Sequence, residues 1–166
     1  MDEIRTSPDE AGDDEAGMTL IELVVVVLII GILMAIAFPS YVGARDRSED
    51  RSAQSALRES SVAARTAFTD HETFDGVTTA GLHAEEPGLD FVAGSNTATA
   101  ASHEISVRTG GTGTSAYLLF VTGSPSGRCF AVLHRGDEAA RFQVSDAPSC
   151  AADDFDPASG TWTDAW

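Results

Sequence analysis

The sequence contains no lysine. All ten of its basic residues are arginine, against 26 acidic residues, and the formal net charge is −16. Seven of the acids lie within the first 15 residues, where Arg5 is the one counter-charge, and this charge density predicts a solvated segment without a fold. The acids also outnumber the arginines in the rest of the chain. A surface of this sign repels phosphate backbones, which excludes broad, direct nucleic-acid binding by the folded part.

The sequence also lacks a catalytic constellation. The segment GSPSG at 123–127 has proline where a nucleophile elbow needs serine, and GTGTSA at 111–116 lacks the third glycine of a dinucleotide-binding loop. The tripeptide RGD at 135–137 resembles an adhesion signal, but between two strands it is far more often a turn. No Cys/His spacing indicates zinc, and the four histidines are scattered, at His71, His83, His103 and His134. We therefore expect no enzymatic activity and no cofactor.

A long apolar run follows the acidic segment. It extends over 25 residues from Met18 to Val42, and about 20 are enough for a helix to span a bilayer. Glu22 is the one charged residue inside it, and a carboxylate in hydrocarbon costs up to about 2.5–3.5 kcal/mol at a helix centre and less near an end. No arginine lies between Arg5 and Arg45 to pair with it along the helix. Two interpretations remain: a carboxylate in the headgroup layer, or one with a specific cationic partner.

The same run contains a possible cleavage site for signal peptidase. Ala35 and Ala37 form an A-x-A pattern after the apolar stretch, and cleavage there would release a secreted binding or adhesive domain that begins at Phe38. The residues before the run are acidic, whereas a secretory signal has a basic n-region. This alternative predicts a chain without a membrane helix.

The residues around Glu22 favour a different assignment. Gly17-Met18-Thr19-Leu20-Ile21-Glu22, followed by an apolar helix, resembles the processing site of type IV prepilins and pseudopilins, although Met18 replaces the commoner phenylalanine. The resemblance covers only about residues 17–45. It implies cleavage after Gly17 by a prepilin peptidase and N-methylation of the new N-terminus at Met18. Further residues fall where pilins tend to have glycine, proline and tyrosine: Gly31, Pro39 and Tyr41.

The resemblance also gives Glu22 a partner and the chain a function. The carboxylate of one subunit would neutralise the Met18 amine of a neighbour and fix the axial register of a filament. The implied function is a structural subunit of a type IV pilus, with a pseudopilin of a type II secretion system as the alternative. The implied partners are further copies of the chain, the peptidase/N-methyltransferase, an assembly ATPase and a platform protein. The implied location is a single-pass cell membrane before assembly and an extracellular pilus afterwards, although the positive-inside rule alone would place the arginines at 45, 47 and 51 in the cytoplasm.

Beyond the membrane the sequence predicts an amphipathic helix over 43–72. Its apolar stripe is narrow and rich in alanine, which suits close packing on a sheet, and consists of Val42, Ala53, Ala56, Leu57, Ala64, Ala67 and Phe68. Pro39 removes a backbone hydrogen bond and Gly31 weakens the helix before it, so the stretch between them is expected to bend or unwind when subunits pack.

The remaining residues predict one globular head. Residues 73–103 show no clear period and predict a long connecting loop. Four β-rich runs follow, separated by turn residues: EISVR, SAYLLFV, CFAVLH and RFQVS. We therefore predict an α+β fold in which the long helix packs on a four-stranded antiparallel sheet and the acidic C-terminal tail wraps the sheet edge. The predicted parts are a leader at 1–17, a transmembrane and filament-core helix at 18–42, the amphipathic helix at 43–72 and the head at 73–166.

The tail contains two further candidates. An even, distant pair of cysteines outside the cytoplasm indicates a disulfide between Cys129 and Cys150, and it resembles the C-terminal disulfide loop of type IV pilins. Two reduced cysteines in a core are the alternative. The segment DDFDP resembles the calcium loop of major pseudopilins, which makes Asp153, Asp154 and Asp156 a weak metal candidate. A solvated acidic turn is favoured, because the spacing does not match an EF-hand.

Overall fold

The structure is a computed structural model that describes residues 18–136 and 138–166. The predicted leader at 1–17 and Asp137 of the RGD tripeptide lie outside the described residues. The chain divides into two compact units, with the boundary between Tyr41 and Val42.

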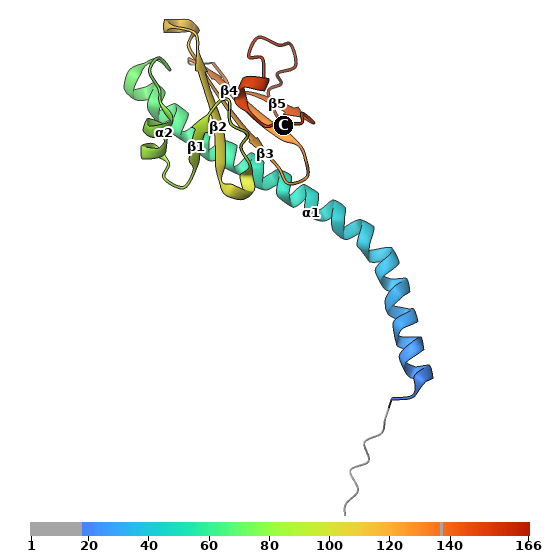
Figure 1. Cartoon of the computed structure of the whole chain (residues 1–166). Coiled ribbons are helices and arrows are strands. Elements are labelled where there is room, and N and C mark those ends of the chain that lie inside the picture. The colour runs from blue at the N-terminus through green and yellow to red at the C-terminus, as the bar shows by residue number, and fades with distance from the viewer. Residues whose placement is uncertain (1–17, 137) are drawn as a thin grey trace, which may run out of the picture. The chain divides into compact units, whose positions relative to one another are not determined.

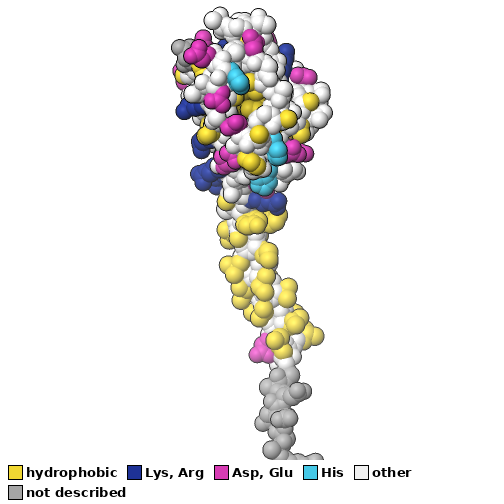
Figure 2. Space-filling model, turned by 90° about the vertical axis from the view of Figure 1, so that its left-hand side faces the viewer, with side chains coloured by type: hydrophobic (Ala, Val, Ile, Leu, Met, Phe, Trp, Pro, Cys, Tyr) yellow, Lys and Arg dark blue, Asp and Glu magenta, His cyan; other side chains and the backbone are white. Residues whose placement is uncertain are grey.

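Helix α1 begins at Leu20 in the first unit and ends at His71 in the second (Figure 1). Within the first unit all side chains from Met18 to Tyr41 are exposed, and nearly all are apolar. Figure 2 shows these apolar side chains in yellow. Within the described part of the chain, α1 is the one helix long and apolar enough to cross a membrane. The structure therefore contains the helix that the apolar run predicted as a candidate membrane span.

The second unit contains the rest of α1 and a sheet. The buried residues of the helix recur every three or four positions, as expected for one core-facing stripe: Ala53, Ala56, Leu57, Ser60, Ala63 and Ala64. Four members of the predicted stripe are thus buried, whereas Ala67 and Phe68 are half-buried and Val42 is exposed. These side chains belong to the core that α1 shares with the sheet.

The sheet has five strands in chain order: β1 (Asp90–Ala93), β2 (Glu104–Gly110), β3 (Tyr117–Gly123), β4 (Cys129–Arg135) and β5 (Arg141–Ser145). Strands β2 to β5 form consecutive antiparallel pairs, and these are the four predicted runs. Strand β1 pairs with β2 in parallel, with Asp90 opposite Glu104. The α+β class fits, but the prediction of a four-stranded antiparallel sheet is wrong, because the sheet is mixed and has a fifth strand.

The prediction of a long loop over 73–103 is also wrong. This segment contains the short helix α2 (Thr79–Glu85), strand β1 and a 3-10 turn (Ala100–Ser102). Thr78 caps α2, because its hydroxyl accepts a hydrogen bond from the amide of Gly81. Leu82 and Leu89 from this segment are almost fully buried in the core that α1 shares with the sheet. These elements are too short to show a helical or strand period.

Both faces of the sheet are covered. Phe120, Phe130 and Val132 point toward α1 and form the larger core with its alanine stripe. Alternate residues of β3 and β4 point the other way and pack against Ala152, Phe155 and Trp162 of the C-terminal tail. The tail thus covers a face of the sheet. At the edge it adds one antiparallel bridge, between Phe142 of β5 and Thr163.

Candidate functional site

Helix α1 begins with a capping box. Thr19 immediately precedes the first helical residue, and its hydroxyl accepts a hydrogen bond from the amide of Glu22 at 3.3 Å. In return, Oε2 of Glu22 accepts hydrogen bonds from the amide of Thr19 at 2.9 Å and from its hydroxyl at 2.8 Å. Two amides that the helix leaves without intrahelical partners are therefore satisfied reciprocally. Glu22 is held at a fixed position in the first turn.

The charge of Glu22 is not neutralised by any described arginine. None of the ion pairs among residues 18–136 and 138–166 involves it. The helix N-terminus carries a partial positive charge that favours a carboxylate in the first turn, by about 0.3–1 kcal/mol. This is far less than a full cationic partner supplies in an apolar environment. The site therefore presents a positioned anion beside residue 18.

Three other predicted positions bear on this region. Gly17 lies outside the described residues, so cleavage after it and methylation of Met18 stay predictions. Helix α1 continues through both Gly31 and Pro39. A Cβ atom on Gly31 would meet nothing within 4 Å, so packing within the chain does not require glycine there. Bending or unwinding between these residues in a filament also stays a prediction.

The two cysteines of the head form the predicted disulfide. Cys129 of β4 is bonded to Cys150 at the start of the tail, with their Cα atoms 5.3 Å apart. The tail passes so close to β3 that a Cβ atom on Gly123 would lie 2.8 Å from Sγ of Cys150. The disulfide thus fixes the tail at the point where it turns onto the sheet.

The three acids of the predicted metal candidate are not gathered into one group. Asp153 faces the guanidinium of Arg108 at 3.8 Å, and Oδ1 of Asp156 accepts the amide of Ala158 within its own turn. Over the described residues no group of three or more His, Cys, Asp or Glu side chains is arranged to hold a metal ion. In the RGD tripeptide, Arg135 donates a hydrogen bond to the carbonyl of Pro157. This arginine is thereby engaged with the tail.

An anchor between α1 and the sheet was not predicted. Asp50 accepts hydrogen bonds from the hydroxyl of Ser126 at 2.6 Å and from the guanidinium of Arg128 at 3.1 Å, both in or beside the β3–β4 turn. Partial burial opposes ionisation of Asp50, but the bonds from Ser126, Ser124 and Arg128 outweigh it and hold the pKa below its usual value. Asp50 therefore stays charged and fastens the helix to this hairpin.

A buried histidine forms a second link. Nε2 of His134 on β4 lies 3.0 Å from Oγ of Ser61 on α1, and the ring packs edge-on against Phe120. Burial, together with the charge of Arg65, lowers the pKa of His134 to about 4. The ring is therefore neutral at physiological pH. Ser61 also donates to the carbonyl of Leu57, and among the described residues no hydrogen bond from a second titratable group orients His134, so the pair is not arranged as a nucleophile and base.

Sequence reasoning missed the capping box and both of these links. The box was readable, because Thr-x-x-Glu before an apolar run is its signature. The bonds of Asp50 and His134 join residues more than 70 positions apart, and no local pattern marks them.

Comparisons with known proteins give one match. The family model of the prokaryotic N-terminal methylation motif matches residues 13–38, which include the capping box and most of the exposed apolar part of α1. No curated protein and no solved structure matches the chain significantly.

Proposed function

From the class III signal peptide of type IV pilins and pseudopilins that the chain carries at residues 13–38, we propose that it is a structural subunit of a type IV pilus. The motif indicates a pilin-like or pseudopilin protein, a substrate of prepilin peptidase and a membrane-anchored precursor. We further propose that the mature chain polymerises through its N-terminal helix into an extracellular filament. The observation that carries this proposal is the coincidence of the motif with the carboxylate of Glu22, which is held by the capping box at the start of the exposed apolar part of α1.

The charge of Glu22 supports assembly. Removal of the leader after Gly17 creates a cationic amine at Met18, four positions before the carboxylate. In a bundle of apolar helices the carboxylate of one subunit pairs with the amine of another, and attraction there is much stronger than in water. An unpaired charge would be costly, so the pair fixes the register of each incoming subunit. The capping box contributes by holding Oε2 in one position before the partner arrives.

The exposed apolar surface supports the same reading. Nineteen large hydrophobic side chains are exposed among the described residues, and all except Val62 lie between Met18 and Val42. A contiguous apolar surface of this size marks contact with a membrane or with other protein chains. The proposed subunit uses it for both in turn: lipid covers the helix before assembly, and neighbouring helices cover it afterwards. On this proposal the chain has no active site of its own and is a building block.

The first test is the N-terminus of the mature chain. Intact mass of the membrane or filament fraction should give a chain that begins at Met18 with one methyl group. Replacement of Gly17 by a bulky residue should leave the leader attached and prevent assembly. A mature chain that begins at Phe38 would instead identify a secreted protein released by signal peptidase.

The second test separates the charge of Glu22 from its capping role. Glu22→Leu removes both. Glu22→Gln keeps the oxygen that accepts from Thr19 but removes the charge, and Thr19→Ala keeps the charge but removes the hydroxyl. If charge pairing drives assembly, both Glu22 variants should be processed yet form few sheared filaments by electron microscopy, because removing one member of a buried pair costs about 3–5 kcal/mol. Thr19→Ala should assemble. Filaments of Glu22→Gln at unchanged number and length would refute the charge pairing.

The pseudopilin alternative predicts a different phenotype. Deletion of the gene would then abolish secretion of proteins through the outer membrane and leave surface filaments unchanged. A calcium dependence of head stability would favour this alternative, whereas loss of surface filaments on deletion favours the pilus.

A further inference from the structure

Four arginines follow one face of the second part of α1. Arg47, Arg51, Arg58 and Arg65, the arginine stripe, are all exposed. At 100° per residue they lie within about 40° of one another, on the side opposite the buried stripe of Ala53, Ala56 and Ala63. From the first to the last, the arginine stripe extends about 27 Å along the helix axis at 1.5 Å per residue. Figure 2 shows arginine side chains (dark blue) gathered along one edge of the head.

The arginine stripe has no partner within the described chain. None of its four members takes part in an ion pair among residues 18–136 and 138–166. Two acids of the same helix are paired with other arginines, because Glu49 pairs with Arg45 and Asp50 with Arg128. Arg47 and Arg51 are four residues apart, a spacing at which like charges destabilise a helix. The 19 acids of the part of the chain after residue 17 thus leave these four arginines without an ion pair among the described residues.

An apolar side chain lies inside the arginine stripe. Val62 is 61% exposed, four residues after Arg58 and three before Arg65, so it shares their face of the helix. It is the one exposed large hydrophobic residue described beyond Val42. Arginine is enriched at protein interfaces, and Val62 adds an exposed apolar side chain to the same face.

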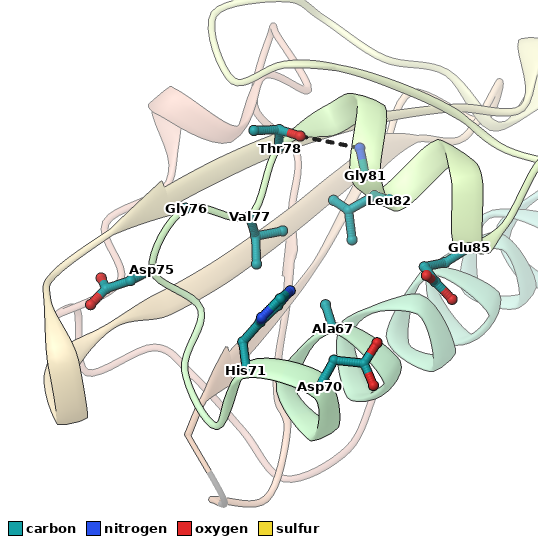
Figure 3. A pocket seen from close by; sticks show the side chains of 10 residues that line it. All are labelled: Ala67, Asp70, His71, Asp75, Gly76, Val77, Thr78, Gly81, Leu82 and Glu85. Carbon is teal, nitrogen blue, oxygen red and sulfur yellow. Dashed lines mark hydrogen bonds between the residues drawn. The ribbon is translucent and has the colours of Figure 1, made fainter.

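The opposite charge is concentrated in the same unit. Between residues 66 and 107 the chain has seven acids and no arginine: Asp70, Glu72, Asp75, Glu85, Glu86, Asp90 and Glu104. The acidic end, residues 70–90, contains a depression of about 320 Å³ formed by the end of α1 and by α2. Asp70 and Glu85 lie on one side of it, beside the apolar side chains of Val77 and Leu82 (Figure 3). Asp75 lies on the other side, where its carboxylate accepts a hydrogen bond from the amide of Gly113. Such a depression suits an arginine, whose stem is apolar and whose head is cationic.

We propose that the arginine stripe docks on the acidic end of a second copy of the chain, with Val62 at the centre of the contact. The two patches are different surfaces of one molecule, so the contact is heterologous, and contacts of this type generate open helical assemblies where the rotation between copies does not close into a ring. The proposal rests on the proposed function, because a filament brings the copies together. It gives the head its own charge-matched contact, separate from the packing of the apolar helices.

A membrane surface is a less suitable partner. Helices that lie on lipid insert an apolar face below their charged flanks. Here the apolar face of α1 is buried against the sheet, and Val62 alone interrupts the charged side. Lipid also provides no reason for an acidic complement within the same unit.

The test is a charge swap in the full chain with its own assembly system. Arg51→Glu/Arg58→Glu and Asp70→Arg/Glu85→Arg should each reduce the number of sheared filaments by at least about tenfold, because like charges then face each other across the contact. The chain with all four substitutions should return to within about twofold of the unchanged protein. Cleavage at Met18 and formation of the Cys129–Cys150 disulfide verify that each variant is inserted and folded.

Matched variants control for net charge. Arg51→Gln/Arg58→Gln and Ser48→Glu/Ser52→Glu both lower the charge by two units, but the two serines lie on the helix beside the arginine stripe and not within it. The first pair should reduce assembly and the second should not. Equal effects of the two pairs would show that only net charge matters, and would overturn the proposal.

A second measurement is independent of filaments. Two variants are mixed in detergent at low salt: Arg51→Glu/Arg58→Glu and Asp70→Arg/Glu85→Arg. The two chains should associate with each other but neither with itself, and added salt should dissociate the complex. Absence of this association, or a four-substitution chain that stays defective while the unchanged protein assembles, overturns the docking contact and leaves the proposed function intact. A defect that follows the anionic-lipid content of the membrane would assign the arginine stripe to lipid and also overturn it. Failure of the unchanged protein to form filaments refutes the proposed function. In that case, association of the two mixed variants still supports the docking contact, and its absence overturns the contact.

Discussion

Acidification should loosen the contact between α1 and the sheet through one residue. His134 is buried between them, with Nε2 at 3.0 Å from Oγ of Ser61. Its pKa is about 4 in the folded chain, whereas an unfolded chain has a histidine pKa of about 6.5. Between these values the unfolded state binds a proton that the folded state does not. The contribution of neutral His134 to the free energy of unfolding is therefore fully present above pH 6.5 and is lost as the pH is lowered toward 4.

The magnitude follows from the two pKa values. Lowering of the His134 pKa from 6.5 to about 4 corresponds to a loss of stability of roughly 3 kcal/mol once the pH is below both values, and of about 2 kcal/mol at pH 5. A domain of this size is stable by only about 5–15 kcal/mol, so the loss is a substantial fraction. Arg65 acts in the same direction, because its charge disfavours a second cation nearby.

The assay is urea unfolding of the full chain in detergent at several pH values between 7.5 and 5. Trp162 and Trp166 both lie in the second unit and report on the head by fluorescence. His134→Gln keeps a group that can bond to Ser61 but does not titrate, and its stability should be nearly independent of pH over this range. His71→Gln, at an exposed position, should keep the slope of the unchanged protein.

A free energy of unfolding that stays constant from pH 7.5 to 5 in the unchanged protein would refute the reasoning. So would an equal slope in the His134→Gln variant, because the loss would then come from other groups.

Three further substitutions test the packing of the head. Cys129→Ser/Cys150→Ser opens a loop of 21 residues and should destabilise the head by about 3 kcal/mol, measured as a lower midpoint of thermal unfolding. Asp50→Ala removes the acceptor of the hydrogen bonds from Ser126 and Arg128 and should cost about 1–3 kcal/mol in urea unfolding, with Glu59→Ala at an exposed position as the control. Gly123→Ala places a Cβ atom 2.8 Å from Sγ of Cys150 and 3.1 Å from the carbonyl of Ala98, so about 1–3 kcal/mol should be lost. Gly160→Ala, where a Cβ atom meets nothing within 4 Å, is the control and should leave the midpoint unchanged. Formation of the disulfide in each variant is checked by non-reducing peptide mapping, and unfolding midpoints equal to that of the unchanged protein would contradict these assignments.

The elements with a long period were predictable from the sequence. The apolar run and the alanine stripe predicted α1, and β-rich runs between turn residues predicted β2 to β5. Strand β1 has four residues and α2 has seven, too few to reveal a period. They are stabilised by contacts that are distant in sequence, such as the pairing of Phe91 with Ile105 and the burial of Leu82. Such contacts override local propensity.

The role of the tail was only partly predictable. Strands β3 and β4 are almost continuously apolar, which is typical of strands buried on both faces. This pattern shows that something covers the second face, but not that Phe155 and Trp162 of the acidic tail do so. At the start of α1 the sequence showed the anomaly of Glu22, and the family motif gave its expected partner. The structure adds the capping box, which shows how the carboxylate of Glu22 is held in position for that expected partner.

The order of the strands has a consequence for folding. Each strand pairs with the one that precedes it in the chain, so a head that forms from its N-terminal side finds every new strand's partner already present. Such sequential pairing keeps loop-closure entropy small and favours fast folding. The tail, which seals the second face of the sheet, arrives last. With only two cysteines in the chain, the one intramolecular disulfide available joins β4 to that tail. The disulfide thus ties the cover of the second face to the sheet and has no incorrect partner within its own chain.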